Sequence, residues 1–176
     1  MKKYELTAES IVKFGRILFR IKALVAFGDV EAGELGGFVE KEENLDQSGD
    51  AWVSGDAWVS GNARVSGNAR VSGDAWVYGD AWVYGDARVF RMSHYLTVGP
   101  LGSRDDFTTF FRTKHLTIGV KCGCFKGDID QFFEAVEKTH GNNKHARAYK
   151  AAIALAKLQI DLDEEDSDEE ETGKES

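Results

Sequence analysis

The segment from Gly99 to Lys114 carries the residues best suited to binding a ligand. The backbone amides of Gly102 and Ser103 could form an anion-binding nest, and arginine, threonine and lysine side chains follow as hydrogen-bond donors. Phenylalanines in the same stretch could stack on a planar base. These features predict binding of a phosphate-bearing, nucleotide-like compound. The predicted ligand-binding residues are Ser103, Arg104, Thr108, Thr109, Arg112 and Lys114.

A second interpretation of this segment requires no ligand. It describes a Gly-rich turn leading into a strand whose phenylalanines belong to the core. The arginines would then be solvated or paired with Asp105 and Asp106. The segment matches neither a Walker nor a dinucleotide-binding fingerprint, so both interpretations remain open.

Two other groups of residues could perform chemistry. His94, just past a repeated region, is the nearest candidate for a general base. Cys122 and Cys124 with His140 and His145 could supply four zinc ligands, but structural zinc sites usually separate their cysteines by two to four residues, and one residue intervenes here. We expect reduced cysteines, a surface role for His94, and neither metal nor cofactor.

Seven consecutive hexapeptides between Asp50 and Phe90 dominate the middle of the chain. A typical unit reads Ala-Trp-Val-Ser-Gly-Asp, with Arg replacing Trp in some units. Because side chains alternate along a strand, Ala and Val lie on one face and Trp or Arg on the other. Gly-Asp and Gly-Asn are common turn formers. The pattern therefore predicts short strands separated by tight turns.

This pattern is similar to the repeats of left-handed β-helix proteins, in which three hexapeptides form a triangular coil of 18 residues. The resemblance implies left-handed parallel coils in which residues 18 positions apart stack. It predicts three outer ladders: Trp52 with Arg70 and Arg88, Trp58 with Trp76, and Arg64 with Trp82.

Outward-facing tryptophans on these ladders predict a contact surface. Exposed apolar patches often mark interfaces, and Trp and Arg are enriched at binding hot spots. We expect a homo-oligomer, with a trimer favoured because the resembled class is commonly trimeric. The predicted oligomer or partner interface consists of Trp52, Trp58, Arg64, Arg70, Trp76, Trp82 and Arg88.

The sequence predicts a mainly β fold with an α+β C-terminal part. Alternating residues around Gly15 indicate a hairpin, Phe38, Val39 and Leu45 could anchor a degenerate first coil, and Gln131 completes a helix-capping pattern. The predicted divisions are residues 1–27 as an N-terminal β cap, 28–93 as a β-helix, 94–160 as a C-terminal domain of strands and two helices, and 161–176 as a disordered acidic tail.

Charge and hydropathy narrow the function classes. The net charge is −8, and residues 161–176 hold ten acids and one lysine, so the remaining body is close to neutral. This distribution argues against direct nucleic-acid binding, although the tail could be a decoy for a basic partner. No apolar run reaches the length of a membrane span, and we expect a cytoplasmic protein.

Residues 4–157 also resemble a type of phage and prophage accessory protein. The resemblance rests on Gly36-Gly37-Phe38-Val39-Glu40, the Gly-Asp-Ala-Trp-Val repeats, Gly99-Pro-Leu-Gly-Ser-Arg104 and Cys122-Gly-Cys124-Phe125. We interpret the chain as a non-enzymatic binding protein, a counter-defence inhibitor that sequesters a nucleotide-like signal or occludes a host defence protein. The alternatives are a structural trimerisation scaffold and an acyltransferase-like enzyme, the latter because many hexapeptide β-helices are acyltransferases.

Overall fold

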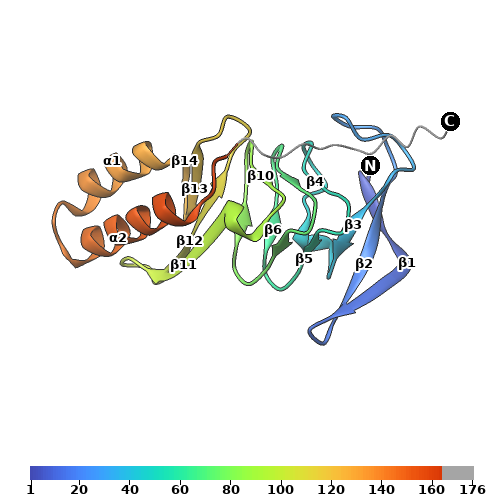
Figure 1. Ribbon diagram of the computed structural model, residues 1–176, viewed down its shortest axis with the longest axis horizontal. Coiled ribbons are helices and arrows are strands. Elements are labelled where there is room, and N and C mark those ends of the chain that lie inside the picture. The colour runs from blue at the N-terminus through green and yellow to red at the C-terminus, as the bar shows by residue number, and fades with distance from the viewer. Residues whose placement is uncertain (164–176) are drawn as a thin grey trace.

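A computed structural model describes residues 1–163 of the protein, and within them it contains fourteen β-strands and two α-helices. A row of short strands forms the middle of an elongated molecule, with a long hairpin at one end and a sheet with two helices at the other (Figure 1). Most of the predicted acidic tail, residues 164–176, lies outside the described residues.

The N-terminal hairpin joins the repeats through one sheet. Strands β1 (Tyr4–Lys13) and β2 (Arg16–Ala23) pair antiparallel around a turn at Phe14 and Gly15, where both φ angles are positive, at 49° and 77°. Strand β2 pairs with β3 (Leu35–Val39), which continues in parallel into the repeats. The hairpin predicted around Gly15 is therefore present.

Strands of two residues begin at every sixth position of the repeated region. They are β4 (Trp52–Val53), β5 (Trp58–Val59), β6 (Arg64–Val65), β7 (Arg70–Val71), β8 (Trp76–Val77), β9 (Trp82–Val83) and β10 (Arg88–Val89). Every pairing among these strands is parallel and joins residues 18 positions apart. The paired strands belong to small sheets. The alanines and valines of the repeats are 0–1% exposed and form the interior.

The register confirms the three ladders. Trp52 pairs with Arg70 and Arg70 with Arg88, Trp58 with Trp76, and Arg64 with Trp82. The predicted anchors of an earlier, irregular coil also pair with the repeats: Phe38 with Trp58, Val39 with Val59 and Leu45 with Val65. A 3-10 helix, η1 (Glu42–Asn44), precedes Leu45.

The prediction that the tryptophans form an exposed row is wrong. Trp52 is 2% exposed and Trp58 is 7% exposed. Tyr4 and Phe27 pack edge-on against Trp52, with ring centroids 6.3 and 5.4 Å away, and Phe14 stacks over Trp58 at 6.1 Å. The N-terminal residues therefore cover the outer faces of these two side chains, while Trp76 and Trp82 remain half-buried.

The C-terminal part is an antiparallel sheet covered by helices. A second 3-10 helix, η2 (Met92–His94), leads into strands β11 (Tyr95–Leu101), β12 (Asp106–Arg112), β13 (Ile118–Cys122) and β14 (Phe125–Asp128), which pair in that order. Helices α1 (Ile129–His140) and α2 (Lys144–Gln159) follow. The predicted capping pattern is confirmed, because Asp128 accepts a hydrogen bond from the Gln131 amide at 2.8 Å.

Strand β12 separates two cores. Phe110 is fully buried with the helices, whereas the adjacent Phe111 packs into the core of the repeats. One face of the sheet thus meets the last strands of the repeated region, and the other meets α1 and α2 (Figure 1). The alternation of a β-strand places these neighbouring phenylalanines in different cores.

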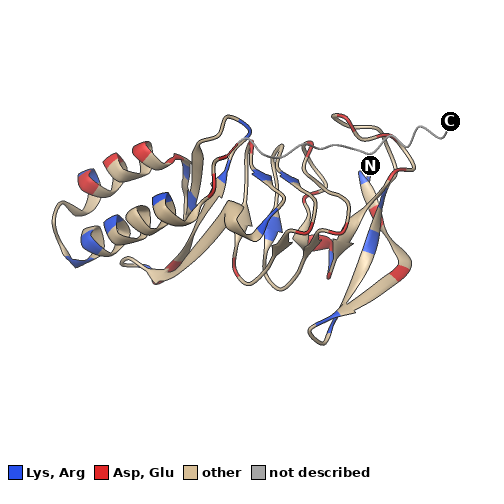
Figure 2. Ribbon diagram, viewed as in Figure 1, with Lys and Arg blue, Asp and Glu red and all other residues tan. Residues whose placement is uncertain are grey.

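The two helices carry complementary charge. Acidic residues predominate on α1, which also holds Lys138, and the charged residues of α2 are basic (Figure 2). Lys150 forms an ion pair with Glu137 at 3.1 Å, and Lys157 lies 3.6 Å from Asp130. These pairs are exposed to solvent, so each stabilises the helix packing only weakly.

Candidate anion-binding pocket

The structure separates the six predicted ligand-binding residues. Ser103 and Arg104 are exposed in the turn between β11 and β12, whereas Lys114 lies beyond the other end of β12 and forms an ion pair with Asp86 at 3.3 Å. The nest and the lysine therefore belong to different parts of the surface.

The remaining three residues are buried in different surroundings. The Thr108 hydroxyl donates to the Cys122 sulfur at 3.1 Å. Arg112 is 5% exposed and donates to the Asp163 carbonyl at 3.1 Å. Thr109 points toward the repeats, where its hydroxyl accepts a hydrogen bond from the Trp82 amide at 3.0 Å. Of the six residues, Thr109 alone lines the pocket described below.

The other candidates for chemistry are also dispersed. His94 is 1% exposed, and its Nδ1 accepts from the Phe90 amide at 3.3 Å, so the expected surface position is wrong. Cys124 is exposed, and the rings of His140 and His145 lie 5.7 Å apart at the junction of the helices. Residues 1–163 contain no group of three or more His, Cys, Asp or Glu side chains arranged to hold a metal ion.

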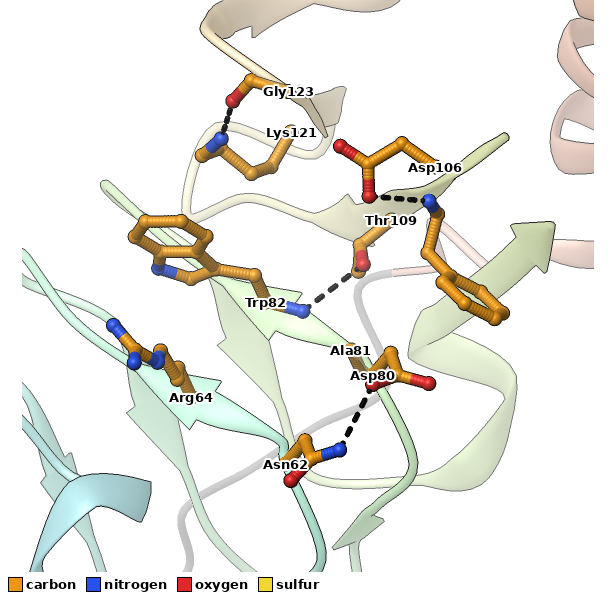
Figure 3. A pocket seen from close by; sticks show the side chains of 10 residues that line it. Asn62, Arg64, Asp80, Ala81, Trp82, Asp106, Thr109, Lys121 and Gly123 are labelled. Atoms are coloured by element: carbon orange, nitrogen blue, oxygen red, sulfur yellow. Dashed lines mark hydrogen bonds between the residues drawn. The ribbon is translucent and has the colours of Figure 1, made fainter. Parts of the chain in front are cut away.

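A hollow of about 240 Å³ lies where the repeats meet the C-terminal sheet. Strands β6 and β9 form one wall and β12 and β13 the other (Figure 3). We call it the Trp82 pocket. Its lining consists of Asn62, Arg64, Asp80, Ala81, Trp82, Asp106, Phe107, Thr109, Lys121 and Gly123.

Trp82 brings three cationic side chains together. Its ring centroid lies 4.2 Å from the Lys121 Nζ, 5.6 Å from the Lys126 Nζ and 5.7 Å from the Arg64 Cζ. The indole Nε1 donates to the Ser66 hydroxyl at 2.8 Å, which helps to fix the ring. Electrostatic attraction between each cation and the ring favours this arrangement.

None of these three cations forms an ion pair with a carboxylate among residues 1–163. Lys121 is 4% exposed, donates to the Gly123 carbonyl and is the cross-strand partner of Lys126. Burial, followed by the nearby charge of Lys126, lowers the pKa of Lys121. Three cations thus surround one ring, and the charge of the nearby Asp106 carboxylate opposes the lowering of the Lys121 pKa.

Two carboxylates and a side-chain amide also line the pocket. The Asn62 amide donates to Asp80 at 3.2 Å, and Asp106 accepts from the Phe107 amide at 2.8 Å. Figure 3 shows Arg64 and Lys121 on opposite sides of the Trp82 ring, with Asp106 at the Lys121 end of the pocket and Asp80 beside Asn62. The pocket is thus lined by both cations and hydrogen-bond acceptors.

Sequence reasoning found only part of this pocket. The 18-residue spacing correctly places Arg64 beside Trp82, but it predicts that both lie in an oligomer interface and not in a pocket. Lys121 and Lys126 were not predicted as site residues. The feature of the sequence that could have revealed them is Gly123. It forms the turn between two short strands and so makes the two lysines cross-strand partners.

The comparisons with known proteins bear on the repeats. The model of the YdcK beta solenoid repeat matches residues 63–79, which include β6, β7 and β8. This match supports a β-solenoid repeat protein, in agreement with the parallel 18-residue register. No curated protein matches the chain. Within residues 1–163, no helix combines the length and apolar character needed to cross a membrane.

Proposed function

We propose that the protein is a non-enzymatic binding protein that sequesters a phosphate-bearing, nucleotide-like ligand in the Trp82 pocket. The observation that carries the proposal is the grouping of Arg64, Lys121 and Lys126 around one indole without a carboxylate ion pair among residues 1–163. Charge-assisted hydrogen bonds from such cations to phosphate are among the strongest in proteins.

The proposal also covers the cellular role of the protein and the handedness of its repeats. The ligand is a signal of a host defence system, and the protein acts in the host cytoplasm by lowering its free concentration. The phage-like segments 99–104 and 122–125 support this role, since both border strands that line the pocket. We also propose left-handed winding of the repeats, which the six-residue period supports.

Loss of either cation of the pocket should weaken binding. Lys121→Met and Arg64→Met are each expected to weaken binding of a nucleoside phosphate about tenfold or more, because each removes a hydrogen bond to a charged group, worth about 1.5–3 kcal/mol. Isothermal titration calorimetry with a panel of linear and cyclic nucleotides measures the effect.

Arg147→Met is the matched control, since Arg147 is exposed on α2 and lies outside the pocket. The affinity of the Arg147→Met variant for the nucleoside phosphate should equal that of the wild type. If no nucleotide or inorganic phosphate binds the wild-type protein, the proposed function fails. Equal losses in the control and in the pocket variants would also contradict it.

The second candidate function is a homotrimeric scaffold, and the tip of the β1–β2 hairpin favours it. Val12, Phe14 and Ile17 are 68%, 79% and 54% exposed, respectively. Phe14 also stacks on Trp76 with centroids 4.9 Å apart, so the tip presents a fixed apolar surface. Exposed surfaces of this kind often mark interfaces, including those with a host protein.

A mass measurement in solution tests the scaffold. Light scattering after size-exclusion chromatography is expected to give the mass of three chains for the wild type and of one chain for Phe14→Ser, because a serine removes the central ring of the apolar tip. Leu158→Ser is the control, since Leu158 is 87% exposed on α2, far along the chain from the hairpin. A monomeric wild-type protein would rule out the trimer.

A further inference from the structure

The described part of the chain ends on a basic surface. After α2 the chain turns back toward the repeats, where the Asp161 amide donates to the Ser93 carbonyl at 3.0 Å (Figure 1). The Asp163 carbonyl accepts a hydrogen bond from the Arg112 side chain at 3.1 Å. These two contacts fix the position from which residues 164–176 continue.

Three arginines lie around this position. The Arg112 Cζ is 4.9 Å from the centroid of the Phe90 ring. Arg88 and Phe90 flank the buried Val89, so the side chains of both point away from the interior of the repeats. Arg91 is exposed and follows directly. We call Arg88, Arg91 and Arg112 together the Arg88 surface.

The first carboxylate of the predicted acidic tail already lies in the field of this surface. The Asp163 amide donates to Oδ1 of Asp161 at 2.9 Å, and this hydrogen bond lowers the pKa of the Asp161 carboxyl. The charges of His94 and Arg91 lower this pKa further. Nearby positive charge favours the ionised form of a carboxyl group, so the surface already attracts the first acid of the tail.

The residues that follow carry the opposite charge to the Arg88 surface. Residues 164–176 contain eight acids and one lysine, since Asp161 and Asp163 account for two of the ten acids in residues 161–176. A fully extended chain covers about 3.3 Å per residue, so this segment can reach roughly 40 Å. Its first few carboxylates can therefore reach both Arg88 and Arg91.

The basic surface is limited to the end of the repeats nearest Asp163. Arg70 is the neighbour of Arg88 in the same ladder, but it forms an ion pair with Asp29. On the other side, Lys114 forms an ion pair with Asp86. Carboxylates from the body of the protein thus neutralise the cations on either side of the surface, which makes Arg88 and Arg91 the preferred contacts of the tail.

We propose that residues 164–176 bind the Arg88 surface of their own chain, with their carboxylates on Arg88 and Arg91, while Arg112 holds the backbone where the segment begins. A segment attached directly beside its site acts at an effective concentration of about 1 mM, which favours it over the tail of a second copy. The bound tail covers the basic surface against other polyanions. The inference is independent of the proposed function, because no residue of the Arg88 surface lines the Trp82 pocket.

Limited proteolysis of the full chain tests tail binding. A protease that cleaves after glutamate should cut at Glu169, Glu170 and Glu171 mainly when the tail is released, so the rate follows the released population. At low salt, the double variant Arg88→Gln/Arg91→Gln is expected to be cut about tenfold faster than the wild type. Tenfold corresponds to about 1.4 kcal/mol, which a few surface ion pairs supply. Mass spectrometry of the released peptides measures the rate.

Substitutions in the tail test the same contact without altering residues 1–163. Glu164→Gln/Glu165→Gln should accelerate cutting at Glu169 to Glu171 as well, whereas Glu175→Gln, far from Asp163 in sequence, should have a smaller effect. Arg147→Gln is the control for the arginine variant, since Arg147 is exposed on α2. It should be cut at the wild-type rate.

Salt provides a further test, because about 1 M salt reduces the screening length to about 3 Å. Cleavage of the wild-type tail should then accelerate to the rate of the double arginine variant. A synthetic peptide of residues 161–176 corrects for the effect of salt on the protease. Equal cleavage of the wild type and both double variants at low salt would overturn tail binding. Cleavage that slows as the protein concentration rises would show that a second copy holds the tail, which would overturn the intramolecular contact.

Discussion

Val71→Asp is expected to prevent folding of the repeated region. Val71 is fully buried, and its strand pairs on both sides, with Val53 and with Val89. A carboxylate at this position would have neither water nor a partner, so the free energy of unfolding should fall by more than about 4 kcal/mol. Far-ultraviolet circular dichroism and urea denaturation measure the loss.

Asn68→Asp is the control for this substitution. Asn68 is an exposed turn residue, and Asp50 and Asp86 occupy the equivalent positions 18 residues away. Its unfolding free energy should change by less than about 0.5 kcal/mol. A folded Val71→Asp protein with the stability of the control would show that the valines do not form a closed apolar interior.

Phe110→Ala is expected to destabilise the C-terminal part by about 3–5 kcal/mol, the usual cost of removing a buried phenylalanine ring. Phe110 is fully buried, and its ring meets Phe132 edge-on at 6.1 Å, so the truncation leaves a cavity between the sheet and the helices. Chemical denaturation measures the change in the free energy of unfolding. Tryptophan fluorescence reports on the repeats, and helical circular dichroism reports on the C-terminal part.

Leu158→Ala provides the comparison, since this side chain is largely exposed on α2 and contributes little buried area. A loss below about 1 kcal/mol for Phe110→Ala would mean that the site collapses around the missing ring. Coincident transitions by both probes would show that the repeats and the C-terminal part unfold together.

The regular part of the fold could be predicted because its period is strict. A Gly followed by Asp or Asn at every sixth position fixes the turns, and from this the pairing of Trp58 with Trp76 and of Arg64 with Trp82 follows. The hairpin at Gly15 and the cap at Asp128 were also predictable, since each depends on residues close in the sequence.

The burial of Trp52 and Trp58 could not be predicted from the repeat itself. The residues that cover them, Tyr4, Phe14 and Phe27, precede the repeats and follow no period. A periodic pattern shows which side chains point away from the interior. It does not show what lies over them.

The candidate site was hard to predict for two related reasons. The alternation of β12 directs Thr108 and Thr109 to opposite faces, which divides a segment that looks continuous in sequence. The Trp82 pocket instead combines Arg64 from the repeats with Lys121 from β13. Tertiary packing alone brings these two strands together.

The 18-residue register makes the repeated region a modular spacer whose length changes in discrete steps. Loss or gain of 18 residues would shift the two ends of the molecule by one strand spacing, about 4.8 Å, and keep their rotational phase. An indel of six residues would rotate the C-terminal sheet onto another side of the coil. Trp82 would then no longer face Lys121, so variation in repeat number compatible with the pocket is restricted to multiples of three hexapeptides.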